Sequence, residues 1–316
     1  MGTAFETELA RWGPLAAPGP RSTTAAVMSV AAAQEYCRRF TRRHSENFSV
    51  TTLLLPRRLL RHFHAVYSFC RWADDLGDET GGGARALDLL RWWRGELLRC
   101  YSGAPRHPVM IALAETITRF DIPPEPFLDL IYAFEQDQLV KRYATYEQLL
   151  DYCRHSADPV GRLVLYLFQC FDAERAQLSD RICTALQLTN FWQDVARDFA
   201  IGRVYLPEED CRRFGYSEAD LGAHRYNRAF VELMRFQVER TRDLFYRGLP
   251  LIERVPAAVR VDVDLFARGG LAVLGKIERQ DYNVWRRRPR LAKWEKGMLL
   301  LGAAWRRWRS AGWRET

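Results

Sequence analysis

Two short acidic clusters carry the chemistry that this sequence suggests. Asp74 and Asp78 lie four residues apart, and so do Asp194 and Asp198. On a helix, residues at i and i+4 share one face, and two like charges there repel by roughly 0.2–0.5 kcal/mol per pair. A chain that places two carboxylates on one helix face in two separate segments is expected to hold a cation. Carboxylates suit Mg²⁺, which shares its coordination with substrate phosphates, so the pattern predicts an enzyme that ionises a diphosphate.

The second pair of aspartates belongs to a longer polar line. At helical spacing, one face of this segment carries Gln187, Asn190, Asp194 and Asp198. Apolar residues flank the line on both sides, namely Leu186, Leu188, Phe191, Trp192, Val195 and Phe199. A polar line between apolar flanks predicts the wall of a cavity. In this interpretation Asn190 adds an amide oxygen to the metal ligands, and Gln187 positions a water.

The first pair follows an apolar stripe made of Phe63, Val66, Tyr67 and Cys70. Continuing that stripe leads to Asp74 and then Asp78, so we expect both carboxylates at the inner end of a core-facing stripe. Arg71 lies three residues before Asp74 and is expected to reach diphosphate oxygens, to pair with the neighbouring acids, or both. The alternative for both clusters is a pair of solvated helix ends, which we disfavour because burying unpaired carboxylates is costly without a cation.

Composition predicts a large helical protein. The chain has 316 residues, 48% of them hydrophobic, so it can build a full core. Strand signals are weak, and helical periods with Gly and Pro punctuation predict helices over 30–43, 56–77, 83–101, 107–120, 124–140, 146–154, 158–171, 176–198, 225–247, 256–281 and 290–309. No linker divides the middle of the chain. We expect one domain over 25–288, after a flexible leader (1–24) and before a basic, Trp-rich C-terminal helix (289–316).

The expected location is the cytoplasm. No uncharged apolar run reaches the ~20 residues that a membrane span needs, and Glu6, Glu8 and Arg11 interrupt any signal-peptide pattern. None of the seven cysteines forms a CxxC pair, which argues against a zinc site. Buried reduced thiols are the simplest interpretation.

The net charge of +8 is concentrated near the C-terminus. Basic residues there interleave with Trp285, Trp294, Trp305, Trp308 and Trp313. This combination is typical of a helix that lies on anionic lipid with Trp at headgroup depth. Peripheral contact with the inner face of the membrane is therefore one hypothesis, and a solvated C-terminal helix is the other. We prefer both to a nucleic-acid patch and expect no nucleic-acid partner.

The motifs together resemble a known family. The segment from Tyr67 to Glu79 is similar to the first signature of squalene and phytoene synthases, and the segment from Leu188 to Asp198 is similar to the second. Gly202-Arg203-Val204-Tyr205-Leu206-Pro207 follows at the family's usual place. The resemblance runs from about Ser45 to about Arg288. It implies an all-α isoprenoid synthase helical bundle with a central cavity and Mg²⁺ as the cofactor.

Within this family the chain is most similar to the hydroxysqualene synthases of bacterial hopanoid biosynthesis. The similar segments are 46–48, 152–162, 269–272 and 276–279, together with Tyr282. They imply conversion of presqualene diphosphate to hydroxysqualene, with water and without a reductant. Two departures leave the product less defined than the ionisation step: Asp158 replaces the Asn more usual in this group, and Gly270 stands where many relatives carry a tyrosine.

Site residues follow from the motifs and from the resemblance. The metal ligands are expected to be Asp74, Asp78, Asn190, Asp194 and Asp198, with Asp75 and Glu79 as auxiliary acids; Arg71 and Gln187 complete the catalytic set. The expected substrate-binding residues are Ser45, Asn47, Phe48, Tyr67, Asp137, Lys141, Arg142, Tyr152, Arg203 and Tyr205. Arg203 and Tyr205 are expected to close over the diphosphate. Carbocations favour aromatic walls, for which the candidates are Phe48, Tyr67, Phe134, Tyr152, Phe168 and Phe191.

Two other functions stay open. One is head-to-head condensation of two farnesyl diphosphates to presqualene diphosphate or squalene, and the full squalene route needs a hydride donor. The sequence lacks a Gly-rich dinucleotide fingerprint, but reductases of this fold lack one too. The other is a non-catalytic helical lipid-binding protein, against which the intact aspartates of both motifs speak. Metal-dependent release of diphosphate would separate these possibilities.

Overall fold

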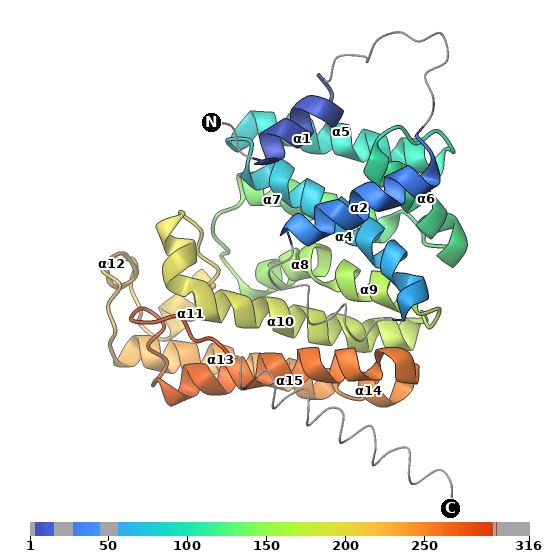
Figure 1. The fold of residues 1–316 in the computed structure, drawn as a ribbon. Helices are drawn as coiled ribbons and strands as arrows, with labels where there is room; N and C mark the ends of the chain where they lie inside the picture. Colours follow the sequence, from blue (N-terminus) through green and yellow to red (C-terminus); the bar gives the residue numbers. More distant parts are fainter. Residues whose placement is uncertain (1–3, 16–27, 45–55, 293–294, 296–316) are drawn as a thin grey trace, which may run out of the picture. The chain divides into compact units, whose positions relative to one another are not determined.

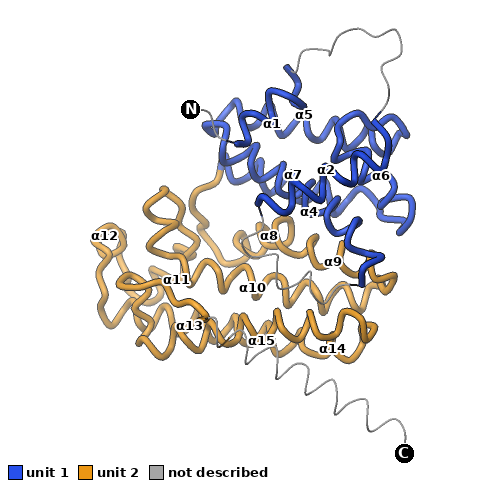
Figure 2. The backbone as a smooth tube through the Cα atoms, viewed as in Figure 1, with its two compact units in different colours: residues 1–139 blue, residues 140–316 orange. Residues whose placement is uncertain are grey.

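The structure is a computed structural model that describes residues 4–15, 28–44, 56–292 and 295. The described residues form helices, and an isolated parallel bridge pairs Arg142 with Val204, so the predicted all-α fold is confirmed. The chain divides into two compact units, residues 1–139 and 140–316 (Figure 2). The domain boundaries expected at 24/25 and 288/289 stay predictions.

Unit 1 is built around one helix, α4 (Arg57–Asp78), which contacts four others. Those neighbours are α2 (Val30–His44), α5 (Gly83–Tyr101), α6 (Pro108–Phe120) and α7 (Glu125–Leu139). Aromatic rings fill the core of this unit. Trp72 of α4 stacks on Trp93 of α5 with 5.3 Å between ring centroids, and both are fully buried. The helix that ends in the first acidic motif is therefore held firmly along its length.

Part of the expected flexible leader is a helix. Residues Ala4–Trp12 form α1, and Phe5 is buried with its ring 5.0 Å from that of Trp72. Tyr36 donates a hydrogen bond to the Glu8 carboxylate at 3.0 Å. In the sequence, the Gly- and Pro-rich residues that follow hide the amphipathic pattern of residues 4–12. Burial of Phe5 on the core of unit 1 orders this helix.

Unit 2 is likewise organised by its longest helix, α10 (Ala173–Ala200). Figure 1 shows α8 (Tyr146–Ser156) and α9 (Asp158–Leu167) on one side of α10, with α13 (Arg228–Gly248) and α15 (Ala257–Arg279) on the other. Shorter helices complete the unit: α11 (Glu208–Arg213), α12 (Glu218–Gly222) and α14 (Leu251–Arg254). Asp172 caps the start of α10 by accepting a hydrogen bond from the Arg175 N–H at 2.7 Å.

Two glycines allow these helices to approach closely. A Cβ at Gly161 would overlap the side chains of Ser179 and Cys183, so α9 packs on α10 through bare backbone. A Cβ at Gly270 would overlap the ring of Phe245. A residue with a side chain at position 270 would therefore require the Phe245 ring of α13 to move.

Most predicted helices match observed ones to within a few residues. The short acidic turn at Ser217 begins α12 with a capping box, in which Ser217 and Asp220 each accept from the other's backbone N–H. The structure adds α1, α11, α12 and α14 to the predicted ranges. Most of the helix expected over 290–309 lies outside the described residues.

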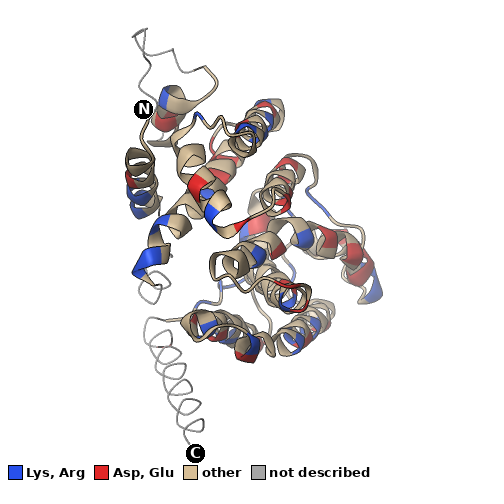
Figure 3. Cartoon of the chain, turned by 90° about the vertical axis from the view of Figure 1, so that its right-hand side faces the viewer, with Lys and Arg blue, Asp and Glu red and all other residues tan. Residues whose placement is uncertain are grey.

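The described helices do not suggest a membrane span, because none combines the length and the apolar character that crossing a bilayer demands. Acidic and basic residues are interspersed along the described helices (Figure 3). All seven cysteines are free.

A buried histidine in unit 1 predicts how stability depends on pH. The ring of His107 lies among aromatic side chains, 4.5 Å from Trp72 and 4.8 Å from Trp93, and accepts the Val109 N–H at 3.2 Å. Burial lowers the pKa of His107 to about 3. The unfolded chain takes up this proton near pH 6.5 and the folded chain does not, so stability is lost as the pH falls below about 6.5.

We expect wild type to lose about 2 kcal/mol more stability than His107→Asn between pH 7.5 and 5. Asparagine keeps an N-cap acceptor but does not titrate. Urea denaturation of both proteins at the two pH values measures the difference, which removes the contributions of all other titrating groups. Equal pH dependence of the two proteins would contradict a neutral, buried His107.

Candidate functional site

The first acidic motif lies at the C-terminal end of α4 and is organised by one arginine. Arg71 Nη1 is 2.9 Å from Asp74 Oδ2, and Nη2 lies 2.5 Å from Asp75 Oδ1 and 3.4 Å from Glu79 Oε1. Of the two expected roles of Arg71, pairing with the neighbouring acids is thus present in the structure. Asp78, one turn after Asp74, is exposed.

The burial of this motif differs from the expected core-facing stripe. Asp75 is fully buried, Asp74 is half-buried and Asp78 is exposed. Burial raises the pKa of Asp75 to about 7, although the Arg71 charge opposes this. The buried face of α4 runs one position away from the predicted stripe, through Leu59, His62, Ala65, Phe69, Trp72 and Leu76. The stripe residues Phe63, Val66, Tyr67 and Cys70 are only half-buried.

A glutamine that the sequence did not single out fixes the turn after this motif. Gln138 of α7 donates through Nε2 to the Gly77 carbonyl at 3.3 Å and accepts the Gly83 N–H at 3.2 Å. The intervening Gly81 and Gly82 have φ of 90° and 71°, values that residues other than glycine rarely adopt. Gln138 therefore ties the loop behind the first acids to a neighbouring helix.

The second acidic motif occupies the last two turns of α10, as the spacing predicted. Along one face of the helix, Gln187 is half-buried, Asn190 is exposed, and Asp194 and Asp198 are half-buried. Burial, and then the charge of Asp194, raise the pKa of Asp198 to about 7. Two carboxylates here resist being charged together.

An arginine remote in sequence meets the second motif. Arg288 lies 94 residues after Asp194, and its Nε and Nη2 both donate to that carboxylate, the latter at 2.6 Å. Arg197, one turn away on α10, is 3.5 Å from the same carboxylate. In the sequence Arg288 is one of many basic residues near the C-terminus, and no local spacing connects it to Asp194.

Both motifs stand at the unfavourable end of a helix for negative charge. The C-terminal end of a helix carries about half a negative charge, and an acid there loses typically 0.3–1 kcal/mol. The last turn of α4 carries no basic residue, and that of α10 carries Arg197. The closest positive charges to the acids come from Arg71 in the first motif and from Arg288 in the second. A bound divalent cation would compensate the same charges.

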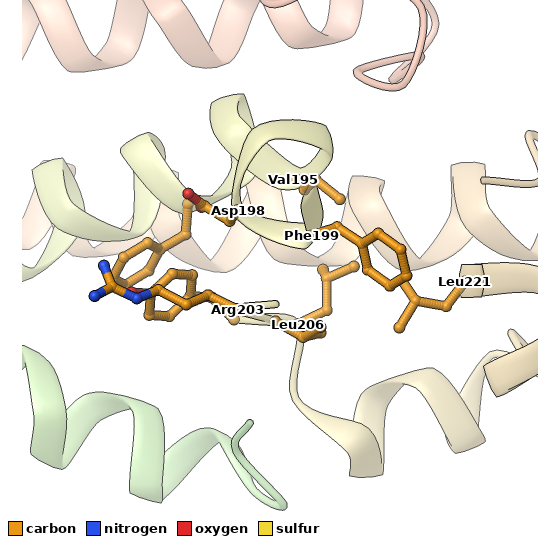
Figure 4. A pocket seen from close by; sticks show the side chains of 9 residues that line it. Val195, Asp198, Phe199, Arg203, Leu206 and Leu221 are labelled. Atoms are coloured by element: carbon orange, nitrogen blue, oxygen red, sulfur yellow. The ribbon is translucent and has the colours of Figure 1, made fainter. Parts of the chain in front are cut away.

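Asp198 also lines a small pocket, shown in Figure 4. Its carboxylate and the Arg203 guanidinium lie at the same end of the pocket, whereas Phe199 and Leu221 lie at the other. The space measures about 10 Å³, roughly what one water requires. This pocket therefore suits a water or an ion and is too small for a prenyl chain.

The expected aromatic wall is in part a packed cluster. The rings of Tyr205 and Phe191 stack with centroids 3.7 Å apart and an 8° tilt. Tyr152 is buried beside both, and Tyr143 stacks on Tyr205 at 5.8 Å. Tyr205, predicted to close over diphosphate, is thus anchored in the unit 2 core.

Backbone pairing holds the segment that carries Arg203 and Tyr205. The Val204 N–H donates to the Lys141 carbonyl at 2.8 Å, and the Glu208 N–H donates to the Tyr143 carbonyl at 3.0 Å. The Arg203 N–H donates to the Asp198 carbonyl at 2.8 Å, which attaches the same segment to α10. The segment is positioned against the second motif from both sides.

A buried ion pair reinforces this segment. Arg240 of α13 is 2.6 Å from Asp210 on α11, and its guanidinium lies 3.4 Å from the centre of the Tyr146 ring of α8. Gln237 donates to the same aspartate at 3.0 Å. These contacts join α8, α11 and α13, and the sequence contained no pattern that pointed to them.

The other expected substrate-binding residues are dispersed. Tyr67 donates to the His44 carbonyl at 3.2 Å, and Asp137 is half-buried near the end of α7. Lys141 is exposed, and Arg142 pairs with Glu218 at 2.7 Å beside a groove of about 420 Å³. Phe134 and Phe168 are half-buried. Three expected residues lie outside the described part of the chain: Ser45, Asn47 and Phe48.

The donors present fit a divalent cation only as an incomplete set. Within the described residues, no group of three His, Cys, Asp or Glu side chains is arranged to hold a metal. Asp194 and Asp198 supply a pair of hard oxygen ligands, and their mutual repulsion favours a cation between them. Such a pair suits Mg²⁺, which completes its shell with waters and phosphate oxygens.

Comparisons with known proteins agree on one family. The family described as squalene/phytoene synthase matches residues 41–295. The phytoene synthase of Arthrospira platensis is 31% identical over 283 residues, which cover 84% of this chain and 90% of that protein. The phytoene synthase of Thermus thermophilus is 33% identical over 262 residues, covering 83% of this chain and 89% of that protein.

Solved structures agree as well. The squalene synthase HpnC from Alicyclobacillus acidocaldarius superposes with a TM-score of 0.78 at 46% identity, covering 80% of this chain and 96% of that one. A dehydrosqualene synthase in complex with ligand superposes with a TM-score of 0.77 at 26% identity, covering 87% and 96%.

The buried ion pair yields a stability prediction. Arg240→Met keeps the aliphatic stem but leaves the buried Asp210 without its charged partner, so we expect a loss of about 3 kcal/mol. Urea denaturation measures this loss. Arg247→Met, an exposed position on the same helix, is the matched control and should change stability by no more than about 0.5 kcal/mol. Equal losses in the two variants would show that the Arg240 contacts contribute little.

Proposed function

This chain belongs to the squalene/phytoene synthase family, and we propose that it converts presqualene diphosphate into hydroxysqualene, with Mg²⁺ assisting the loss of diphosphate. The observation that carries the proposal is the repeated placement of paired aspartates at a helix C-terminus, each beside an arginine. The squalene-type product is supported by 46% identity to a protein described as a squalene synthase, against 31–33% to the two phytoene synthases compared above.

The residues divide the work of ionisation. Each acid pair would hold Mg²⁺, Asp74 with Asp78 and Asp194 with Asp198, and the cation would stabilise the charge that develops on a departing diphosphate. Arg71 holds the Asp74 carboxylate in place at 2.9 Å. Arg203, beside Asp198, adds a positive charge for diphosphate oxygens.

The remaining steps involve the carbocation and water. The bond between carbon and the diphosphate oxygen breaks, and the cyclopropylcarbinyl cation rearranges. A water oxygen then forms the new C–O bond, and its proton leaves to solvent or to the diphosphate. Gln187, half-buried two turns before Asp194, is proposed to position that water. Apolar surroundings protect the cation until capture.

A second candidate is condensation of two farnesyl diphosphates. The observation in its favour is that similar proteins covered over about nine-tenths of their length are phytoene synthases. The same acid pairs would serve this reaction. Incubating the purified protein with Mg²⁺ and either farnesyl or presqualene diphosphate, without NADPH, separates the two candidates by their products.

The acid pair on α10 is tested by single substitutions. Asp194→Asn and Asp198→Asn each remove one ligand charge, so we expect turnover to fall at least about 100-fold, equivalent to about 2.7 kcal/mol of transition-state stabilisation. Circular dichroism should show an unchanged helical fold. Asp180→Asn, on the same helix but paired with Arg162, is the control and should retain activity within a few-fold. Near wild-type turnover of either variant at saturating Mg²⁺ would refute the ligand assignment.

Water capture is tested with isotope. In ¹⁸O-water, presqualene diphosphate should yield an alcohol that carries one ¹⁸O atom, because the hydroxyl oxygen comes from solvent. Mass spectrometry of the extracted product makes the measurement, with the same incubation in ordinary water as its reference. An unlabelled alcohol, or squalene that forms only when NADPH is added, would reject the proposed product.

A further inference from the structure

The contact between Arg288 and Asp194 has a two-pronged geometry that engages both oxygens of the carboxylate. Nε and Nη2 of Arg288 donate to Oδ1 and Oδ2 respectively, so each oxygen accepts one N–H of the same guanidinium. Fork-to-fork pairs of this kind are the stronger class of charge-assisted hydrogen bonds. The Asp194 side chain is 15% exposed and that of Arg288 is 27% exposed, so solvent screens the pair only in part.

The loop after α15 holds Arg288 in position. Trp285, three residues earlier, stacks on the His224 ring at 4.4 Å and packs on Phe230 at 5.6 Å. The Gln280 amide donates to the Arg287 carbonyl at 3.1 Å. The backbone on the N-terminal side of Arg288 is thus anchored to unit 2, and the guanidinium is presented to Asp194 by packed structure rather than by a loose surface chain.

A carboxylate that is fully engaged by a guanidinium offers a cation no oxygen without cost. A cation that binds Asp194 either displaces an arm of Arg288 or lies close to the positive charge of its guanidinium, and both cost free energy. Arg197 and Arg203 add further positive charge to the same end of α10. The cation and the guanidinium therefore compete for one ligand.

We propose that Arg288 competes with the divalent cation for Asp194, so that the acid pair on α10 binds metal weakly until the guanidinium has moved away. This inference rests on the proposed role of Asp194 as a metal ligand. Only the fraction of molecules in which Arg288 has left Asp194 is competent to bind the cation. The apparent dissociation constant is therefore the intrinsic one divided by that fraction. An arriving ligand with anionic oxygens gives the displaced guanidinium a new partner, so cation and diphosphate are expected to bind cooperatively.

The competition is tested by Mn²⁺ binding to the full chain, with free Mn²⁺ measured by electron paramagnetic resonance. Asp74→Asn/Asp78→Asn serves as the background, so that only the α10 pair is titrated. In this background Arg288→Gln should bind Mn²⁺ at least about 10-fold more tightly. Arg288→Lys keeps the charge but loses the planar fork and should also bind more tightly. Arg197→Gln removes a charge near the same carboxylate and should change affinity less than about 3-fold.

Further variants and measurements separate competition from simple charge removal and from the proposed function. Adding Asp194→Asn should abolish the gain caused by Arg288→Gln, because the coupling lies between these two residues. In the background protein with Arg288 intact, inorganic diphosphate should tighten Mn²⁺ binding by a larger factor than it does in Arg288→Gln. Circular dichroism verifies that each variant is folded, and Arg288→Lys supplies a second test if Arg288→Gln is not.

Unchanged or weaker Mn²⁺ binding in both folded Arg288 variants overturns the competition, even if turnover still requires Mg²⁺. A gain equal to that of Arg197→Gln overturns it as well, since charge alone would then explain the effect. Tighter binding without any turnover of prenyl diphosphates supports the competition and counts against the proposed reaction. Absence of Mn²⁺ binding in every variant rejects both the competition and the role of Asp194 as a metal ligand.

Discussion

Negative charge gathered at the C-terminal ends of two helices is the constraint on which this protein depends. Each helix, α4 or α10, is the one that most others in its unit contact. Repulsion between neighbouring carboxylates and the helix dipole both act against the acids there. In each unit, the helix with the most helix neighbours therefore holds in place carboxylates that would otherwise move apart or take up protons.

The two units compensate this charge in different ways. In unit 1 the arginine comes from the same helix, and Arg71 reaches three acids that follow it. In unit 2 the arginine comes from a loop 94 residues later and takes both oxygens of one acid. The helix backbone keeps Arg71 within one or two turns of its acids. Arg288 is supplied by a loop instead, and the proposed competition requires only that its guanidinium moves away from Asp194 while the loop backbone stays anchored.

The scaffold around the second motif explains why its charges keep their positions. The segment with Arg203 and Tyr205 is joined to α10 and to residues 141–143 by backbone hydrogen bonds, and Tyr205 stacks on Phe191. Arg240 and Asp210 then link the helix that follows the segment to α13. Packing and ion pairing here serve the placement of Asp198 and Arg203 at one end of their pocket.

The sequence by itself determined the helices, the two acid pairs and the family, because these depend on residues within a turn or two of each other. Spacing placed Asp194 and Asp198 on one face of α10 correctly, but it did not reveal that Asp75 is the buried acid of the first motif. That depends on which side of α4 meets Trp93 and its neighbours. Only the tertiary structure decided that Arg288 meets Asp194, that Arg240 meets Asp210, and that Tyr205 is packed. These contacts join residues 30 to 94 positions apart, or add packing that local periodicity does not encode, and chain folding alone brings such groups together.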